Sequence, residues 1–155
     1  MKRIALITGT RKGIGRRIAE YLLAQGWHVA GCSRRSSDLQ SDTYRHYDID
    51  ISAETAVIAM VRRIKRDLGP IDALINNAGT ASMNHLLLTP ASSYRSIFDT
   101  NVLGSFLVMR ECAKQMSRRK KGRIINFSTV AAAMDLEGEA LYAASKSAIE
   151  SLTRI

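Results

Sequence analysis

A short apolar run followed at once by a glycine-rich turn constrains the fold of this chain more than any other feature. Residues 4–7 are apolar without helical spacing, which is typical of a strand. Thr8 and Gly9 follow directly, and Gly13 and Gly15 complete the turn before a helical pattern begins. A strand that leads through such a turn into a helix N-terminus leaves backbone N–H groups free to bind phosphate. The segment therefore predicts strand, tight turn and helix, with a phosphate-binding site between them.

Strands and helices alternate along the rest of the chain. The first helix carries its apolar residues at Ile14, Ile18, Tyr21 and Leu22, and Gly26 ends it. Further strands are expected at residues 28–33, 44–51 with an exit loop, 73–76 and 123–128. Helices are expected at 53–68, with Ser52 as N-cap, around the face Val102, Phe106, Met109, Ala113 and Met116, and from Leu141 to Ile155. This alternation requires a parallel sheet with right-handed crossovers and helices on both faces.

Length and composition favour one globular domain. The chain has 155 residues, of which 46% are hydrophobic and 24% charged, and no internal repeat interrupts it. Neither early apolar run approaches the roughly 18 residues that span a bilayer, and no secretory cleavage pattern follows the N-terminus. We therefore expect a cytoplasmic protein without a membrane partner.

Cysteine and charge patterns exclude some functions. Cys32 and Cys112 have neither CxxC spacing nor nearby histidine clusters, so no disulfide framework and no metal site is expected. The net charge of +9 includes basic residues at 62–66, on the polar side of one expected helix, and at 118–121, which close another helix where cations complement the dipole. A nucleic-acid surface would also explain the charge, but no aromatic residues or nucleic-acid motif accompany it. We therefore expect no nucleic-acid partner.

Three motifs in order along the chain resemble those of one enzyme family. The turn glycines have the spacing Gly-x-x-x-Gly-x-Gly, Asn76-Asn77-Ala78-Gly79 ends the fourth strand, and Tyr142 precedes Lys146 by four residues. On a helix this last spacing puts both side chains on one face. The chain resembles the short-chain dehydrogenase/reductase family, and in particular its 3-oxoacyl reductase-like members. The resemblance implies an α/β fold: a single Rossmann-type NAD(P)-binding domain over residues 1–155, doubly wound in three α/β/α layers and lacking the last strands of the full family fold.

The resemblance also implies a nicotinamide cofactor. The second strand ends in Ser33 and Arg34, without the carboxylate that accepts a ribose 2′-hydroxyl in NAD-dependent proteins. Arg34, Arg11 and Lys12 can instead pair with a 2′-phosphate, which favours NADP(H) over NAD(H). At the adenine, Asp50 with Ile51 matches the family pattern, and Asp48 is the alternative. The expected cofactor-binding residues are Gly9, Arg11, Lys12, Gly13, Ile14, Gly15, Ser33, Arg34, Asp50, Ile51, Asn77, Ala78, Gly79, Tyr142 and Lys146.

The same resemblance assigns catalytic roles. Tyr142 would act as acid and base toward a carbonyl or alcohol, while the Lys146 ammonium stabilises its phenolate and binds ribose hydroxyls. Asn101 matches the residue that holds a proton-relay water. The hydroxyl that orients the substrate lies thirteen residues before the tyrosine in the family, which gives Thr129, with Ser128 as the alternative.

Several questions stay open at this stage. The expected substrate is a small carbonyl compound or an acyl thioester, and family members commonly form homo-oligomers through the helices that bear Asn101 and Tyr142. The last helix has no stop signal before Ile155, which indicates a truncated domain. The fifth strand would then be an exposed apolar edge. A catalytically inactive, cofactor-binding fragment is therefore the alternative function.

Overall fold

Five parallel strands form the centre of the molecule. In the computed structural model, which describes residues 2–134 and 136–155, the sheet has the order β3-β2-β1-β4-β5. The strands are β1 (Ile4–Thr8), β2 (His28–Ser33), β3 (Tyr44–Asp48), β4 (Ala73–Asn76) and β5 (Arg123–Asn126). The chain fills the sheet outward from β1 in one direction and then returns to add β4 and β5 on the other side. This confirms the expected doubly wound sheet.

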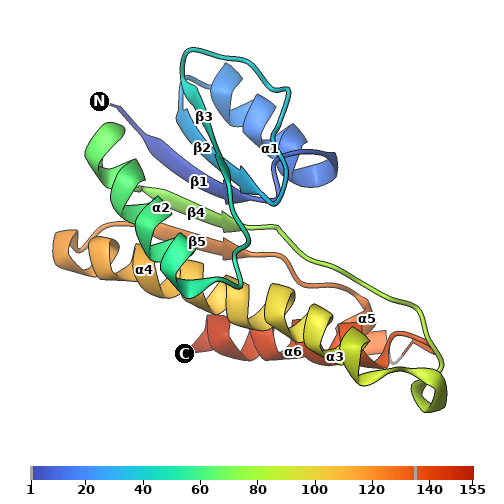
Figure 1. The fold of residues 1–155 in the computed structure, drawn as a ribbon. Helices are drawn as coiled ribbons and strands as arrows, with labels where there is room; N and C mark the ends of the chain where they lie inside the picture. The colour runs from blue at the N-terminus through green and yellow to red at the C-terminus, as the bar shows by residue number, and fades with distance from the viewer. Residues whose placement is uncertain (1, 135) are drawn as a thin grey trace.

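Helices cover both faces of the sheet (Figure 1). On one face lies α1 (Gly13–Ala24), and on the other lie α2 (Glu54–Asp67) and α4 (Ser105–Arg119). A continuous helical run of α3 (Ala91–Phe98) and a π-helical turn η2 (Asp99–Gly104) leads into α4. The remaining elements are η1 (Leu86–Leu88), α5 (Ala131–Met134) and α6 (Ala140–Arg154), and α6 packs against α3, α5, η2 and β5.

Side chains alternate between two cores because successive strand residues point to opposite faces. Ile4 and Leu6 face the larger core, which α2 and α4 complete with Val57, Ile64 and Val108 among others. The smaller core holds Ile7, Val29, Tyr44 and Ile75 against Ala19 of α1. The two cores fix the position of the strand ends, and with them the loops that follow.

Three details of the expected helices are wrong. In α1, Ile14 and Tyr21 are exposed, and the small residues Gly15 and Ala19 are buried instead. In α4, Phe106 is 39% exposed, and the buried face consists of Leu107, Val108, Cys112 and Met116 together with Ser105. Ser52 does not cap α2, because its N–H and hydroxyl both donate to Asp50 and the helix begins after Ala53 without a side-chain cap.

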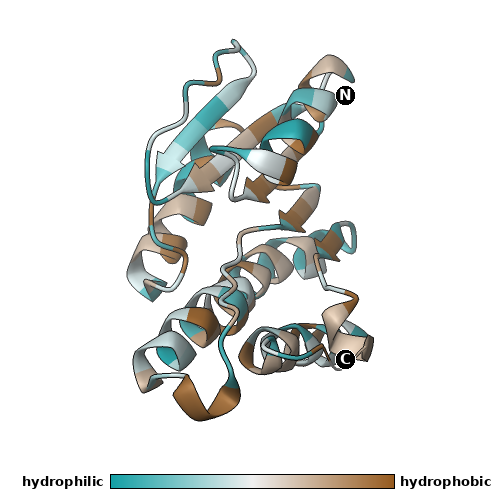
Figure 2. Ribbon diagram, turned by 90° about the vertical axis from the view of Figure 1, so that its right-hand side faces the viewer, coloured by the Kyte–Doolittle hydropathy of each residue, from teal (hydrophilic) through white to brown (hydrophobic). Residues whose placement is uncertain are grey.

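The free edge of the sheet is apolar, as expected. Within the described residues strand β5 pairs with β4 alone, and its Ile125 is 52% exposed. A second exposed apolar segment is η1, whose three leucines are exposed and whose ribbon is brown at the lower end of Figure 2. Across the part of the chain that the structure describes, no helix combines the length and hydrophobicity needed to cross a membrane.

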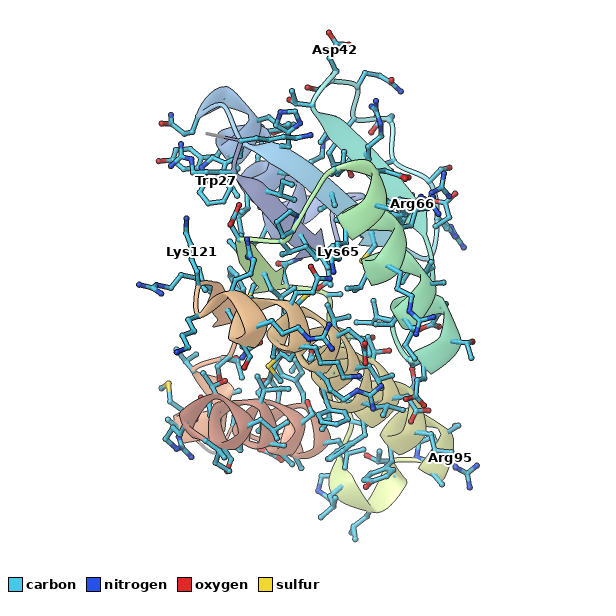
Figure 3. All side chains as sticks on the ribbon, turned by 90° about the vertical axis from the view of Figure 1, so that its left-hand side faces the viewer. Trp27, Asp42, Lys65, Arg66, Arg95 and Lys121 are labelled. Carbon is cyan, nitrogen blue, oxygen red and sulfur yellow. The ribbon has the colours of Figure 1, made fainter. Side chains whose placement is uncertain are left out.

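Basic side chains gather at the opposite end of the helices from the glycine-rich turn. Lys65 and Arg66 lie in the last turn of α2, and Arg118 and Arg119 in that of α4. Figure 3 labels Lys65, Arg66 and Lys121 on this side of the molecule. Arg66 pairs with Asp67, and Arg119 with Asp72 at 3.2 Å. The charges therefore lie where cations complement helix dipoles.

Candidate active site

A cleft of about 690 Å³ opens at the carboxyl ends of the strands. It lies where the strand order reverses between β1 and β4, the position at which open parallel sheets bind ligands. Most of the expected cofactor-binding residues line it. The lining consists of Gly9, Arg11, Lys12, Gly13, Cys32, Ser33, Arg34, Arg35, Ile49, Asp50, Ile51, Asn77, Ala78, Gly79 and Thr100.

Hydrogen bonds at Thr8 join the end of β1 to the loop after β4, where the strand order reverses. The Thr8 hydroxyl accepts from the N–H groups of Asn77 and Ala78, at 3.1 and 3.0 Å. The Asn77 amide donates in turn to the Thr8 carbonyl, 3.0 Å away. The buried Thr8 and the half-buried Asn77 thus hold the loop after β4 beside the glycine-rich turn. Thr8 was not expected as a site residue, because a threonine at the end of a strand also fits simple packing.

Gly9 and Gly15 of the turn must be glycines, because neighbouring atoms lie too close to leave room for a Cβ. Gly9 has a φ of +78°, and a Cβ there would lie 2.8 Å from the Asn77 amide nitrogen. At Gly15 a Cβ would collide with the Gly9 carbonyl and with the same amide. Gly15 therefore lies behind the cleft wall and Ile14 lies outside the cleft, 61% exposed. The turn has the open backbone that a bound pyrophosphate needs.

Basic residues surround the end of the cleft at β2. Ser33, Arg34 and Arg35 follow the strand, and the Ser33 hydroxyl donates to the Arg35 carbonyl at 2.7 Å. Among the cleft-lining residues that the structure describes, Asp50 alone carries a carboxylate. The backbone N–H of Ser52 donates to that carboxylate and holds the pKa of Asp50 below its usual range. This end of the cleft therefore suits an anion.

The other end of the cleft leads to Lys146 of α6. A Cβ on Gly79 would lie 3.3 Å from the Asn101 Oδ1 atom and 3.6 Å from the Lys146 Nζ atom, so these three residues meet. Lys146 is 6% exposed, and its Nζ donates to the Phe127 carbonyl at 2.7 Å. Burial lowers the pKa of its ammonium group from the ordinary value. The Nζ atom lies 5.9 Å from the centre of the Tyr142 ring, as the helical spacing requires.

Asn101 lies in the π-helical turn rather than at the start of a helix. Its Oδ1 accepts from the Thr80 N–H at 2.8 Å, and its Nδ2 donates to the Thr80 carbonyl at 2.9 Å. The same Nδ2 donates to Ser145 of α6 at 3.0 Å. π-Helical turns leave the regular pattern of backbone hydrogen bonds and are frequent at functional sites. Here the turn brings η2, the loop after β4 and α6 together.

Two hydroxyls follow β5, and their contacts differ. Ser128 is exposed and its hydroxyl donates to the Glu150 carboxylate of α6. Thr129 is half-buried and accepts only from the Ala131 N–H, at 3.3 Å, among the hydrogen bonds of the described residues. The Thr129 hydroxyl is therefore the one that still has a hydrogen to donate.

A metal has no evident place in this arrangement. Over residues 2–134 and 136–155, no three His, Cys, Asp or Glu side chains gather as a metal site requires. The cleft instead combines glycine backbone, basic side chains and a tyrosine–lysine pair. These are groups that bind a phosphorylated ligand and move protons.

Comparison with known proteins identifies this combination. The model of the family described as short chain dehydrogenase matches residues 3–155. A curated relative, 3-oxoacyl-[acyl-carrier-protein] reductase FabG of Staphylococcus aureus (strain Mu50 / ATCC 700699), is 33% identical over 164 residues, which cover 99% of this chain and 67% of that protein. The same-named protein of Vibrio cholerae is 30% identical and covers 98% and 65% of the two chains. This chain thus spans about two thirds of the length of such relatives.

Solved structures agree with the sequence comparison. "ElxO with NADP Bound" superposes with a TM-score of 0.93 at 28% identity, covering 98% of this chain and 65% of that one. "4-hydroxyisoleucine dehydrogenase complexed with NADH" has a TM-score of 0.90 at 28% identity and covers 98% and 66%. The sheet order, the glycine-rich turn and the tyrosine–lysine helix all lie within the matched residues. The chain belongs to the short-chain dehydrogenase family of oxidoreductases.

Proposed function

We propose that the chain binds NADP(H) and catalyses hydride transfer between it and a carbonyl or alcohol substrate. The observation that carries this proposal is the meeting of Lys146, Asn101 and Gly79 at the end of the cleft, with Tyr142 on the same face of α6 as Lys146. A cofactor seated on the glycine-rich turn would run along the cleft toward this point. The cleft residues fit such a cofactor, because the glycine turn is open and its basic end suits phosphate.

Tyr142 and Lys146 would manage the proton. Bound NADPH would supply the hydride for the carbonyl carbon. Tyr142 donates its phenolic proton to the carbonyl oxygen as the alcohol forms. The Lys146 ammonium stabilises the resulting phenolate and binds ribose hydroxyls, and Asn101 holds the water through which the proton is replaced. Lys146 Nζ donates to the Phe127 carbonyl, which holds it close to where this role requires it.

Thr129 is the better candidate for the substrate-orienting hydroxyl. Ser128 is occupied by Glu150, and Thr129 lies thirteen residues before Tyr142, as the family spacing demands. The Thr129 methyl group restricts the side-chain rotamer and narrows the space for a substrate. We therefore assign Thr129 and retain Ser128 as the alternative.

Cofactor and substrate preferences follow from different observations. The basic cleft end at Arg34, Arg11 and Lys12 favours NADP(H), and a solved relative binds NADP. The relatives named 3-oxoacyl-[acyl-carrier-protein] reductase suggest a 3-oxoacyl thioester as the substrate class here. A small ketone is the simpler probe of the same chemistry.

The first experiment is a titration of the purified chain with NADPH and NADH, read by nucleotide fluorescence and thermal shift, with a 3-oxoacyl thioester reduction assay. We expect stabilisation by NADPH, and Tyr142→Phe to keep binding while losing turnover by about a hundredfold or more. Tyr21→Phe, on an exposed tyrosine of α1, is the control and should retain activity. A folded chain that binds neither nucleotide would refute the proposal.

The alternative function is cofactor binding without turnover. The open edge at β5 and the exposed Ile125 favour it, because an uncovered strand edge next to α6 leaves the catalytic helix with less support. Nucleotide binding with no turnover in the wild-type chain would establish this alternative.

We also propose that the chain forms a homo-oligomer through α4 and α6. Phe106 of α4 and Leu152 of α6 are 39% and 38% exposed. Sedimentation velocity of the purified chain tests this association.

A further inference from the structure

A chain of hydrogen bonds runs behind the basic end of the cleft, through His46 of β3. The imidazole side chain is 12% exposed. Its Nδ1 atom lies 2.7 Å from the Tyr44 hydroxyl, which lies 2.9 Å from the hydroxyl of Thr10 in the glycine-rich turn. On its other side, Nε2 lies 3.0 Å from the Ser33 hydroxyl and 3.2 Å from the Arg35 carbonyl. His46 therefore connects the two walls of the cleft.

The direction of these hydrogen bonds can be worked out from their acceptors. Ser33 donates to the Arg35 carbonyl, so its oxygen must accept from His46 Nε2–H. His46 Nδ1 then accepts from the Tyr44 hydroxyl at 2.7 Å, which is the shorter of its two contacts because the Thr10 hydroxyl lies 3.4 Å away, and the Tyr44 oxygen accepts in turn from Thr10. Every donor faces an acceptor in this arrangement, which is the state expected of a buried polar network.

The absence of a side chain at Gly31 leaves room for this network in the sheet. Gly31 lies in β2, between the glycine-rich turn and β3, in register with His46. A Cβ at this position would collide with both the Thr10 and the Tyr44 hydroxyls. A side chain larger than hydrogen would therefore push the turn and β3 apart and break the link between them.

The part of the cleft that His46 holds is the segment 33–35. His46 fixes this segment at two points, the Ser33 side chain and the Arg35 backbone, with the exposed Asp48 carboxylate 3.4 Å from the same nitrogen. The turn has an additional anchor, since the Gly9 and Thr10 N–H groups donate to the Cys32 carbonyl at 2.8 and 3.3 Å. Loss of the imidazole would therefore loosen segment 33–35 more than the turn.

We propose that His46 is a positioning residue for recognition of the cofactor 2′-phosphate. It acts through Ser33 and the backbone of Arg35, which it holds at the wall of the cleft so that the guanidinium of Arg34 can pair with the phosphate while the Ser33 hydroxyl stays bonded to the Arg35 carbonyl. The inference rests on the proposed function, because it concerns the phosphate that distinguishes NADP(H) from NAD(H). NADH lacks this group, so its binding should depend little on His46.

Two polar substitutions separate positioning from general stability. In His46→Asn the amide reaches the place of Nδ1 and keeps the contact with Tyr44, but it is too short to reach Ser33. In His46→Gln the amide nitrogen reaches the place of Nε2 and can donate to Ser33. Dissociation constants for NADPH and NADH are measured for both variants by fluorescence titration, with thermal unfolding to verify that each variant folds.

The expected result is selective. His46→Asn should weaken NADPH binding by about tenfold, the scale of one hydrogen bond that orders a charged site, and change NADH binding by less than about twofold. His46→Gln should restore NADPH binding to within about threefold of wild type. Tyr47→Phe is the control, because it removes a phenol oxygen from the same strand on the opposite face, in the core with α2. It should leave the ratio of the two dissociation constants unchanged.

Two failures can be told apart. If wild-type chain binds neither nucleotide, the proposed function is wrong and the inference falls with it. If wild type binds NADPH but His46→Asn leaves both affinities unchanged or lowers them equally, His46 plays no part in 2′-phosphate recognition and the proposed function stands. Equal NADPH loss in the Asn and Gln variants would likewise overturn the assigned route through Ser33.

Discussion

The Nδ2 atom of Asn101 lies 3.0 Å from the Oγ atom of Ser145, and both side chains are fully buried. The Ser145 hydroxyl donates onward to the Tyr142 carbonyl at 2.7 Å. Through its other contacts Asn101 also pairs with both backbone groups of Thr80. One amide thus ties the loop after β4, the π-helical turn and α6 at the point next to Tyr142.

We expect Asn101→Ala to destabilise the chain by about 2 to 3 kcal/mol, because it leaves the Thr80 N–H and carbonyl without their side-chain partner. Urea unfolding followed by circular dichroism measures the change. Asn84→Ala is the control: Asn84 is exposed and forms its described hydrogen bond through its backbone N–H, so the change should stay within about 0.5 kcal/mol. Equal effects of the two substitutions would show that the Asn101 contacts contribute little.

Two glycines of the turn should respond differently to alanine. At Gly15 a Cβ collides with the Gly9 carbonyl and Asn77, whereas at Gly13, with φ +63°, it meets nothing within 4 Å. Gly15→Ala should therefore cost about 2 to 3 kcal/mol through overpacking, and Gly13→Ala about 1 kcal/mol through left-handed strain alone. Urea unfolding of both variants gives the order, and a larger loss in Gly13→Ala would contradict the described turn.

The parallel, doubly wound sheet could be predicted from the sequence, but the ends of some strands could not. Parallel pairing and helices on both faces follow from the alternation of apolar runs and helical periods. The expected fifth strand ran to Ser128, whereas β5 ends at Asn126. The reason is tertiary, because Asn126 is in register with Asn76, the last residue of β4. Beyond that point β5 has no neighbour on that side with which to pair.

The buried faces of α1 and α4 could not be predicted correctly from a regular helical period of 3.6 residues. The face counted from Val102 through Phe106 assumed 3.6 residues per turn, but Val102 lies in the π-helical turn, which changes the register before α4 begins. In α1 the buried positions are Gly15 and Ala19, since small side chains let the helix approach the sheet closely. His46 was missed because nothing local in its strand distinguishes a network histidine from a surface one.

Both thiols should be unreactive in the folded chain. Cys32 and Cys112 are fully buried, and burial raises the pKa of Cys32 to about 12 and that of Cys112 as well. Because the thiolate is the nucleophile, we expect almost no reaction with a disulfide reagent at about pH 8, and reaction of both thiols in urea. Ser117→Cys, at an exposed position of α4, should add one reactive thiol. Rapid native labelling without the added cysteine would mean that the core opens.

Stability should rise with pH through Lys146. Burial lowers the pKa of its ammonium group, so the folded chain releases this proton at a lower pH than the unfolded chain does. At neutral pH both states are protonated and the folded state bears the cost of a buried charge. As pH rises through the folded pKa that cost disappears, and the gain is complete above the ordinary lysine range. The free energy of unfolding of wild type minus that of Lys146→Met should therefore increase with pH.

Urea unfolding of both proteins at several pH values between about 7 and 10 measures this difference. Lys65→Met is the matched control, because it removes the charge of a lysine that is exposed on α2 instead of one that is buried. A difference for Lys146→Met that falls as pH rises would mean that the ammonium is stabilised in the folded chain. The hydrogen bond to the Phe127 carbonyl would then outweigh the burial of the charge, and Lys146 would enter the reaction as a firmly held cation.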